Sequence, residues 1–211
     1  MTSLESQIKQ QFARIFNTGD WSAFKLLAEY YLRTATRLRK RDVDIGTPYK
    51  LLARNAQKRL FIGVGCELLV KAFFLKQGYG INKIDRRLLE ERSLERPQLP
   101  YQLGAISSEL LIDAETFSFN QVLAQLGRIA PFNEISRKDR QVIMRGFKIA
   151  KVFRNKEGHI ATLWHTFDPS NYSDIENALI LFYRVGFGEQ LEIQFSVERN
   201  EPDRFVVNPL S

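Results

Sequence analysis

Three residues near the C-terminal end of one predicted helix carry side chains suited to chemistry: Arg154, Asn155 and His159. An imidazole has an unperturbed pKa near 6.5, so His159 can exchange a proton close to neutral pH. A guanidinium binds a phosphate through two parallel hydrogen bonds, which Arg154 could supply. Asn155 precedes His159 by four residues, so the two side chains are neighbours on a helix. Together these groups could bind a phosphate and move a proton beside it.

The helix that must position these groups begins at Ser136, which forms a capping-box-like pair with Asp139. Its apolar side is formed by Ile143, Phe147 and Ala150. Arg154 continues this apolar series. A guanidinium on such a face is partly removed from water, so it must find an anionic or hydrogen-bonding partner.

The spacing of Arg154 and His159 sets a geometric problem. Residues five apart on a straight helix point in directions that differ by about 140°. The two groups therefore do not share a narrow face of one helix. We expect them to converge through the length of the Arg154 side chain, a local distortion at Gly158, or a partner subunit.

The remaining elements follow from apolar spacing and from capping residues. Residues Trp21, Phe24, Ala28, Tyr31, Ala35 and Leu38 are spaced as one stripe of an amphipathic helix, with Asp20 as its N-cap. A second long helix follows Pro48 and ends before Gly78, and a fourth main helix opens near Ser173 and ends at Gly186 and Gly188. Shorter helices are expected over residues 3–16 and 118–129. Ile193, Phe195 and Val197 alternate with polar residues and predict a terminal hairpin with a turn at 200–203.

These elements predict a mainly helical fold with an insertion. Residues 81–101 are polar and rich in charge, which favours an irregular segment with one short helix over 85–92. We divide the chain into a helical bundle, residues 1–190, with a helical insertion at about 80–132, and a β-hairpin tail, residues 191–211. The fold class is all-α, apart from that small hairpin.

Composition excludes several classes of protein. The longest nearly apolar stretch, Phe61–Leu75, is interrupted by Glu67 and Lys71 and falls short of the ~20 residues that a membrane span needs. The chain begins without the pattern of a signal peptide, so we expect a cytoplasmic protein. A single cysteine, Cys66, excludes an internal disulfide and a cysteine-based zinc site. With two histidines and one cysteine, we expect no metal and no cofactor, although scattered carboxylates could still bind Mg²⁺.

The motif and its setting resemble the HEPN family. An Arg, then a polar residue that is often Asn, and a His after four to six intervening positions are its signature, and here they are Arg154, Asn155 and His159, with Phe153 before them. The segment from Glu67 to Phe73, followed by Gly78 and Tyr79, resembles the second helix of that family. The order of elements is also similar, and the resemblance covers about residues 20 to 188.

This resemblance implies an up-and-down four-helix bundle that forms a homodimer and brings two copies of the motif into one cleft. Many members are endoribonucleases that need no metal. Such cleavage uses the neighbouring 2′-hydroxyl of RNA as nucleophile and leaves a 2′,3′-cyclic phosphate and a 5′-hydroxyl. His159 would accept the proton, Arg154 would stabilise charge on the phosphate, and Asn155 would orient His159 or hold a phosphate oxygen.

A basic face on the motif-bearing helix adds a candidate for RNA binding. Arg137, Lys148 and Lys151 fall within roughly 40° of one line, with Asn155 on the same side. Such a stripe is ordinarily a solvated face, and its other interpretation is a track for RNA. The formal charge of +7 and the pI of about 9.6 favour an anionic partner, with nucleic acid first and an acidic protein second.

Three hypotheses of function follow. The first is a metal-independent RNA endonuclease, a toxin of a toxin–antitoxin or defence system, restrained by an antitoxin such as a minimal nucleotidyltransferase. HEPN toxins paired with that antitoxin often carry Tyr two residues after the His, where this chain has Ala161, so silencing at that position is in doubt. The second is a non-catalytic module that binds a nucleotide or a protein. The third, a DNA-binding regulator, depends on charge alone.

Overall fold

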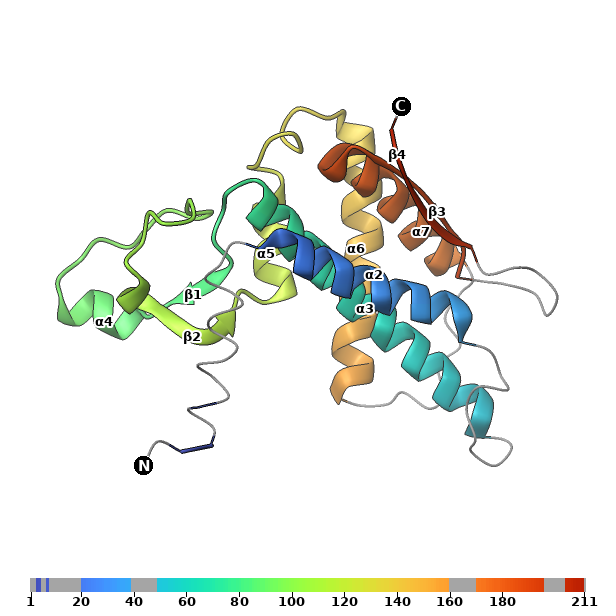
Figure 1. Ribbon diagram of the computed structural model, residues 1–211, viewed down its shortest axis with the longest axis horizontal. Helices are drawn as coiled ribbons and strands as arrows, with labels where there is room; N and C mark the ends of the chain where they lie inside the picture. The colour runs from blue at the N-terminus through green and yellow to red at the C-terminus, as the bar shows by residue number, and fades with distance from the viewer. Residues whose placement is uncertain are drawn as a thin grey trace.

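The computed structural model describes residues 3–4, 7, 20–38, 49–159, 170–195 and 204–210, without the side chains at 49–52, 113–114 and 156–159. The described chain is mainly helical and ends in a small antiparallel hairpin, as the sequence predicts (Figure 1). The main helices are α2 (Trp21–Arg37), α3 (Tyr49–Lys76), α6 (Arg137–His159) and α7 (Ser170–Phe182). The smaller elements are β1 (Asn82–Ile84), α4 (Arg86–Glu91), η2 (Ser108–Leu110), β2 (Leu111–Thr116), α5 (Phe119–Leu126), η3 (Tyr183–Phe187), β3 (Glu189–Ile193) and β4 (Phe205–Pro209).

Local signals in the sequence set the ends of these helices. The Asp20 carboxylate accepts hydrogen bonds from the backbone N–H groups of Ser22 and Ala23, which confirms Asp20 as the N-cap of α2. At the start of α6, the Ser136 hydroxyl accepts a hydrogen bond from the backbone of Asp139, 3.0 Å away. Gly78, just after α3, has a φ of +76°, a conformation that glycine adopts without strain.

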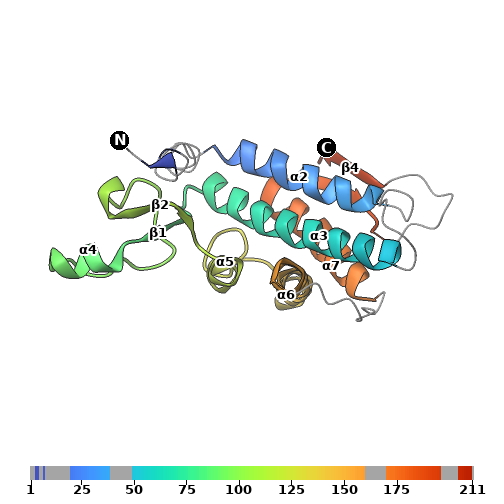
Figure 2. The same cartoon turned by 90° about the horizontal axis from the view of Figure 1, so that it is seen from below.

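Close contacts at glycines hold α6 between α3 and α7. Figures 1 and 2 show α3 between α2 and α6, and α7 also packs against α6. A Cβ atom at Gly63 of α3 would lie 2.6 Å from the Cβ atom of Arg154. A Cβ atom at Gly146 of α6 would lie 2.4 Å from that of Ala178 in α7. Both glycines are therefore needed for the helices to approach this closely.

Aromatic side chains fill the core where these helices meet. Phe182 of α7 is fully buried, and its ring centroid lies 5.5 Å from Phe73 of α3 and 4.9 Å from Phe147 of α6. Phe132, in the segment before α6, lies 5.0 Å from both Phe73 and Phe182. The rings meet edge-on or tilted, the arrangements that aromatic quadrupoles favour. This cluster joins α3, α6 and α7 to the end of the insertion.

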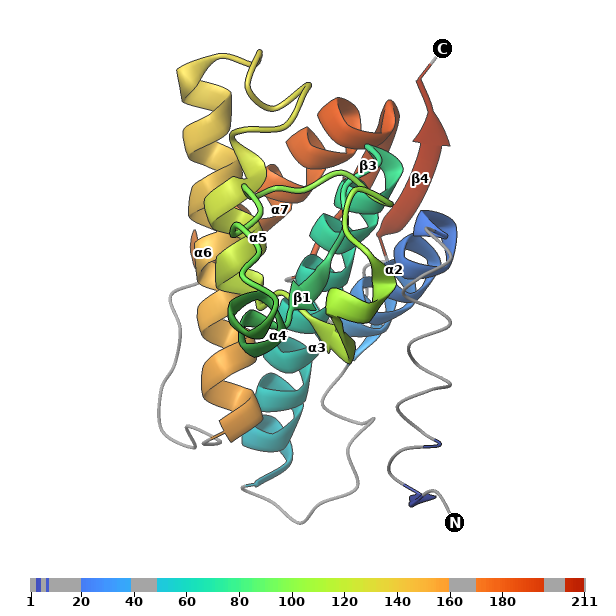
Figure 3. The same ribbon diagram turned by 90° about the vertical axis from the view of Figure 1, so that its left-hand side faces the viewer.

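The insertion contains a small sheet that the sequence did not lead us to expect. Its β1 pairs antiparallel with β2, with Asn82 opposite Thr116 and Ile84 opposite Leu111. The short helix expected over 85–92 is present as α4, capped by Asp85. The expectation of an irregular segment over 81–101 is therefore wrong for residues 82–84, and the expectation of a helical insertion over about 80–132 is wrong for residues 82–84 and 111–116. Figure 3 shows β1, β2 and α4 at the end of the molecule that faces the viewer.

The C-terminal hairpin packs on the same core. Strands β3 and β4 pair antiparallel, with Glu189 opposite Pro209 and Ile193 opposite Phe205. Ile193, Phe205 and the buried Leu191 of β3 belong to the hydrophobic core of the bundle. The preceding helix, α7, begins at Ser170, three residues before the expected start near Ser173. It continues into the π-helix η3, which ends at Gly188 in a left-handed conformation.

Some predictions concern residues outside the described part of the chain. Most of the helix expected over 3–16, the turn at 200–203, and the positions of Ala161 and His165 are among them. In the described ranges, no helix combines the length and the apolar character needed to cross a membrane.

Candidate active site

Arg154 forms an ion pair with a buried carboxylate on the neighbouring long helix. Its Nε atom contacts an Oε atom of Glu67 in α3. The Glu67 side chain is only 5% exposed, whereas that of Arg154 is 38% exposed. The apolar face of α6 thus ends in a cation that is anchored on the protein side and open on the solvent side. This confirms the expectation that Arg154 needs an anionic partner.

Arg154 packs against one side of α3. Gly63, Glu67 and Lys71 follow one another at intervals of four residues, which places them on one side of the helix. The missing side chain at Gly63 lets the backbone of α6 come close at Arg154, since an added Cβ would lie 2.6 Å from the Arg154 backbone nitrogen. One turn further along α3, Glu67 meets the guanidinium. The base and the functional end of Arg154 are therefore both fixed by α3.

Lys71 completes a chain of polar contacts that reaches the insertion. Its Nζ atom donates to Glu67 over 2.7 Å and to the Thr116 hydroxyl of β2 over 2.7 Å. Burial lowers the pKa of Lys71, and the charge of Glu67 and their hydrogen bond oppose that shift. The carboxylate of Glu67 thus lies between two cations, Lys71 inside and Arg154 at the surface.

The guanidinium of Arg154 keeps donors for a further ligand. Arginine carries five N–H donors, and Glu67 occupies the Nε side. One terminal nitrogen lies 3.4 Å from the side-chain oxygen of Asn155, a long hydrogen bond at an exposed residue. An anion arriving from solvent can therefore reach Arg154 without displacing Glu67, and Asn155 is beside it.

The helix that carries the motif is continuous as far as His159. Gly158 lies within α6, so the distortion at Gly158 that could have brought Arg154 and His159 together is not found. The backbone of His159 forms the last residue of α6, while its side chain lies outside what the structure describes. Two of the three expected ways of bringing Arg154 and His159 together are left: the length of the Arg154 side chain and a second subunit.

The basic face of α6 is only partly available to solvent. Arg137 and Lys148 are exposed. Lys151 is half-buried and donates to the side-chain oxygen of Asn120 in α5, 3.1 Å away. Two of the three cations predicted to bind RNA are thus free to meet a ligand, and the third also connects α6 to the insertion.

The sequence shows that Glu67 is an unusual charge in an apolar helix, but not that it pairs with Arg154. Two charged residues four apart, inside the apolar run Phe61–Leu75, must be paired if they are buried, yet the spacing alone does not reveal which distant side chain joins them. Cys66 is fully buried, which agrees with its interpretation as a small apolar residue, and burial raises the pKa of its thiol. Among the described side chains, no group of three or more His, Cys, Asp or Glu residues could hold a metal ion.

Replacing Glu67 by Gln should destabilise the protein by about 2 kcal/mol. The variant keeps the size of the side chain but leaves the buried ammonium of Lys71 without its counter-charge, and breaking a buried ion pair from one side is costly. Urea unfolding followed by circular dichroism measures the difference.

Glu115→Gln is the matched control for this change. Glu115 also pairs with a lysine, Lys83, over 2.9 Å, but both side chains are exposed. We expect a loss of at most about 0.5 kcal/mol, because exposed ion pairs contribute little. Equal losses in the two variants would contradict the role of Glu67 as a buried counter-charge.

We compared the chain with known protein families, proteins and structures. No family model, no curated protein and no solved structure matches the chain.

Proposed function

We propose that the chain is a HEPN-type, metal-independent endoribonuclease that acts as a homodimer. In this proposal α2, α3, α6 and α7 are the four helices of an up-and-down bundle. The observation that carries it is Arg154, a partly exposed cation of α6 that is held by the buried Glu67 of α3, on the same helix as His159. The element order and the Arg154–Asn155–His159 spacing support it as well.

The proposed reaction is a transesterification at a phosphodiester of RNA. The 2′-hydroxyl attacks the adjacent phosphorus and its proton passes to His159. The bond to the 5′-oxygen breaks and that oxygen takes a proton from solvent, which leaves a 2′,3′-cyclic phosphate and a 5′-hydroxyl. Arg154 donates hydrogen bonds to the phosphate oxygens that gain charge. Asn155 orients His159 or binds a phosphate oxygen. Residues five apart point about 140° apart on a straight helix, so in this proposal the reach of the long Arg154 side chain or the partner subunit brings the two groups to one phosphate.

A growth-inhibiting toxin or defence effector is the biological setting that we propose. Arg137 and Lys148 would hold the RNA backbone, with Lys151 at the edge of this track. An antitoxin, for example a minimal nucleotidyltransferase, would restrain the enzyme.

The test is incubation of the purified protein with total RNA in EDTA, followed by analysis of fragment ends. We expect cleavage with 2′,3′-cyclic phosphate and 5′-hydroxyl ends, because neither the nucleophile nor the acid–base group requires a metal. Cleavage that appears only when Mg²⁺ is added, or fragments with 5′-phosphate ends, would contradict the proposal.

A non-catalytic nucleotide- or protein-binding module is the second candidate. The observation in its favour is that Arg154 already has an anionic partner, Glu67, and so has a counter-charge without a substrate. This candidate predicts binding without turnover, and equal tolerance of Arg154→Ala and His159→Ala in cells.

A further inference from the structure

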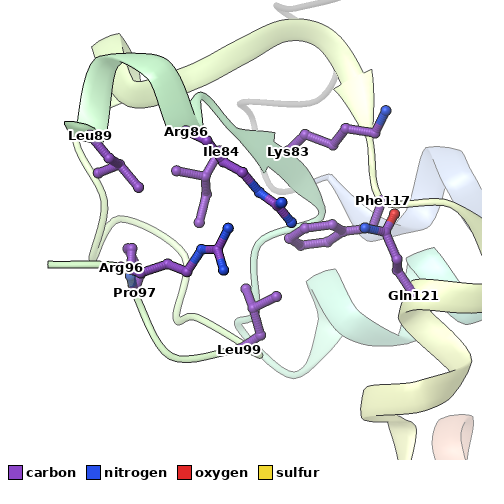
Figure 4. A pocket seen from close by; sticks show the side chains of 9 residues that line it. All are labelled: Lys83, Ile84, Arg86, Leu89, Arg96, Pro97, Leu99, Phe117 and Gln121. Carbon is purple, nitrogen blue, oxygen red and sulfur yellow. The ribbon is translucent and has the colours of Figure 1, made fainter. Parts of the chain in front are cut away.

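A second concentration of positive charge lies in the insertion, far along the chain from the motif. A cavity of about 110 Å³ opens among β1, α4, the loop before Tyr101 and the start of α5. Figure 4 shows the residues that line it: Lys83, Ile84, Arg86, Leu89, Arg96, Pro97, Leu99, Phe117 and Gln121. Three of them are cations and none is acidic, so the cavity is suited to an anion.

Two of these cations differ from the charged residues around them. In the part of the chain that the structure describes, neither Arg86 nor Arg96 has an ion-pair partner. In contrast, Arg87 pairs with Glu91 over 2.8 Å, and Arg92 pairs with Glu109 over 3.0 Å.

The side chains of Arg86 and Arg96 extend toward one another into the cavity, while the Lys83 amino group points away from both (Figure 4). Two facing guanidinium groups repel each other, and an anion between them reverses that interaction. Both residues are exposed, so this repulsion is weak in water, and an anion between the two groups gains hydrogen bonds from both.

The walls of the cavity are fixed by hydrogen bonds. The carbonyl of Leu99 accepts a hydrogen bond from Arg128 over 3.0 Å, and the hydroxyl of buried Tyr101 donates to the carbonyl of Asn82 over 2.9 Å. The loop that carries Arg96 is thereby attached to both β1 and the end of α5. A site that is held in shape before binding loses less entropy on binding.

Beside the two guanidinium groups, the cavity is apolar. Ile84, Leu99 and Phe117 form this wall, and a cavity of about 110 Å³ holds a phosphate group and part of a base, with the rest of a nucleotide outside it. A ligand that fits must combine a compact anion with a short, flat apolar part. A phosphate monoester on a nucleoside has both, since guanidinium groups bind phosphate through paired hydrogen bonds and a base covers apolar surface.

We propose that this cavity, between Arg86 and Arg96, binds the terminal phosphate of a nucleotide, either free or at the 5′ end of a strand. The proposal is independent of the nuclease proposal, because it involves none of the residues of the candidate active site. Lys83 at the rim is paired with Glu115, so the proposal gives the phosphate to Arg86 and Arg96 alone.

The test is isothermal titration of the full chain with AMP, adenosine and inorganic phosphate. We expect AMP to bind at least about tenfold more tightly than either fragment, and added salt to weaken binding. Arg86→Gln and Arg96→Gln should each weaken AMP binding by about tenfold, the loss of one charge-assisted hydrogen bond.

Arg87→Gln and Arg92→Gln are matched controls, because they remove the same charge from the same segment at residues that pair outside the cavity. Equal loss in these controls, or adenosine binding as tight as that of AMP, would overturn the proposal. Short DNA strands with and without a 5′-phosphate resist the proposed RNA cleavage and identify the source of the phosphate. Tighter binding of the 5′-phosphorylated strand than of AMP assigns the site to strand ends, and the reverse assigns it to free nucleotide.

Discussion

Replacing His159 by Ala should reduce RNA cleavage by about a hundredfold or more, while the protein stays folded and dimeric. A general base contributes on the order of 10²- to 10⁴-fold to the rate, and His159 is the group of the motif that can accept a proton at neutral pH. Rates are measured with purified protein on a labelled RNA in EDTA, and the oligomeric state by size-exclusion chromatography. In cells, this one change should also relieve any toxicity of the wild-type protein.

His165→Ala is the matched control, since the chain has only two histidines and His165 lies outside the motif. Arg154→Ala should lose about as much activity as His159→Ala, because the phosphate then lacks its cation. Lys148→Ala should instead weaken RNA binding modestly and reduce its dependence on salt. Cleavage retained in the His159 variant would reject the assignment of the catalytic base.

Replacing Phe182 by Ala should destabilise the protein by about 3–5 kcal/mol, the range for a large aromatic side chain removed from a core. The Phe182 ring is fully buried and contacts rings from α3, α6 and the segment before α6, so no neighbour can close the space without moving a helix. Such a loss is a large share of the stability of a typical domain. Urea unfolding measures this loss as a lower midpoint concentration of urea, while the dependence of the free energy of unfolding on urea concentration stays unchanged.

Leu26→Ala is the control for the Phe182 variant. Leu26 lies on α2 and is 70% exposed, so its truncation should change the free energy of unfolding by less than about 0.5 kcal/mol. A loss below about 1 kcal/mol for Phe182→Ala would show that the aromatic cluster is not a principal source of stability.

Where signals are local, the sequence predicts this fold well. Asp20, Ser118 and Ser136 begin helices as expected because a capping side chain bonds to backbone groups two or three residues away. Gly78 ends α3 for an equally local reason, its positive φ. The burial of Phe147 and Phe182 also follows from helical periodicity.

Pairings between distant segments could not be predicted in the same way. Strand β1 has three residues and pairs with a segment about thirty positions later, and neither strand shows a clear alternation that marks it. The contact of Arg154 with Glu67 joins residues of two helices separated by the whole insertion. The sequence indicated that Arg154 needs a partner, but helix packing decides which one it has.

The hydrogen bond from Lys71 to Thr116 has a consequence for any attempt to shorten the protein. Thr116 belongs to the insertion, and Phe132 at its far end packs on Phe73 and Phe182. A chain trimmed of residues 80–132 would leave a buried ammonium short of an acceptor and strip the aromatic cluster of one ring. The insertion is therefore part of the core of the bundle, and a chain without it should fail to reach the native state.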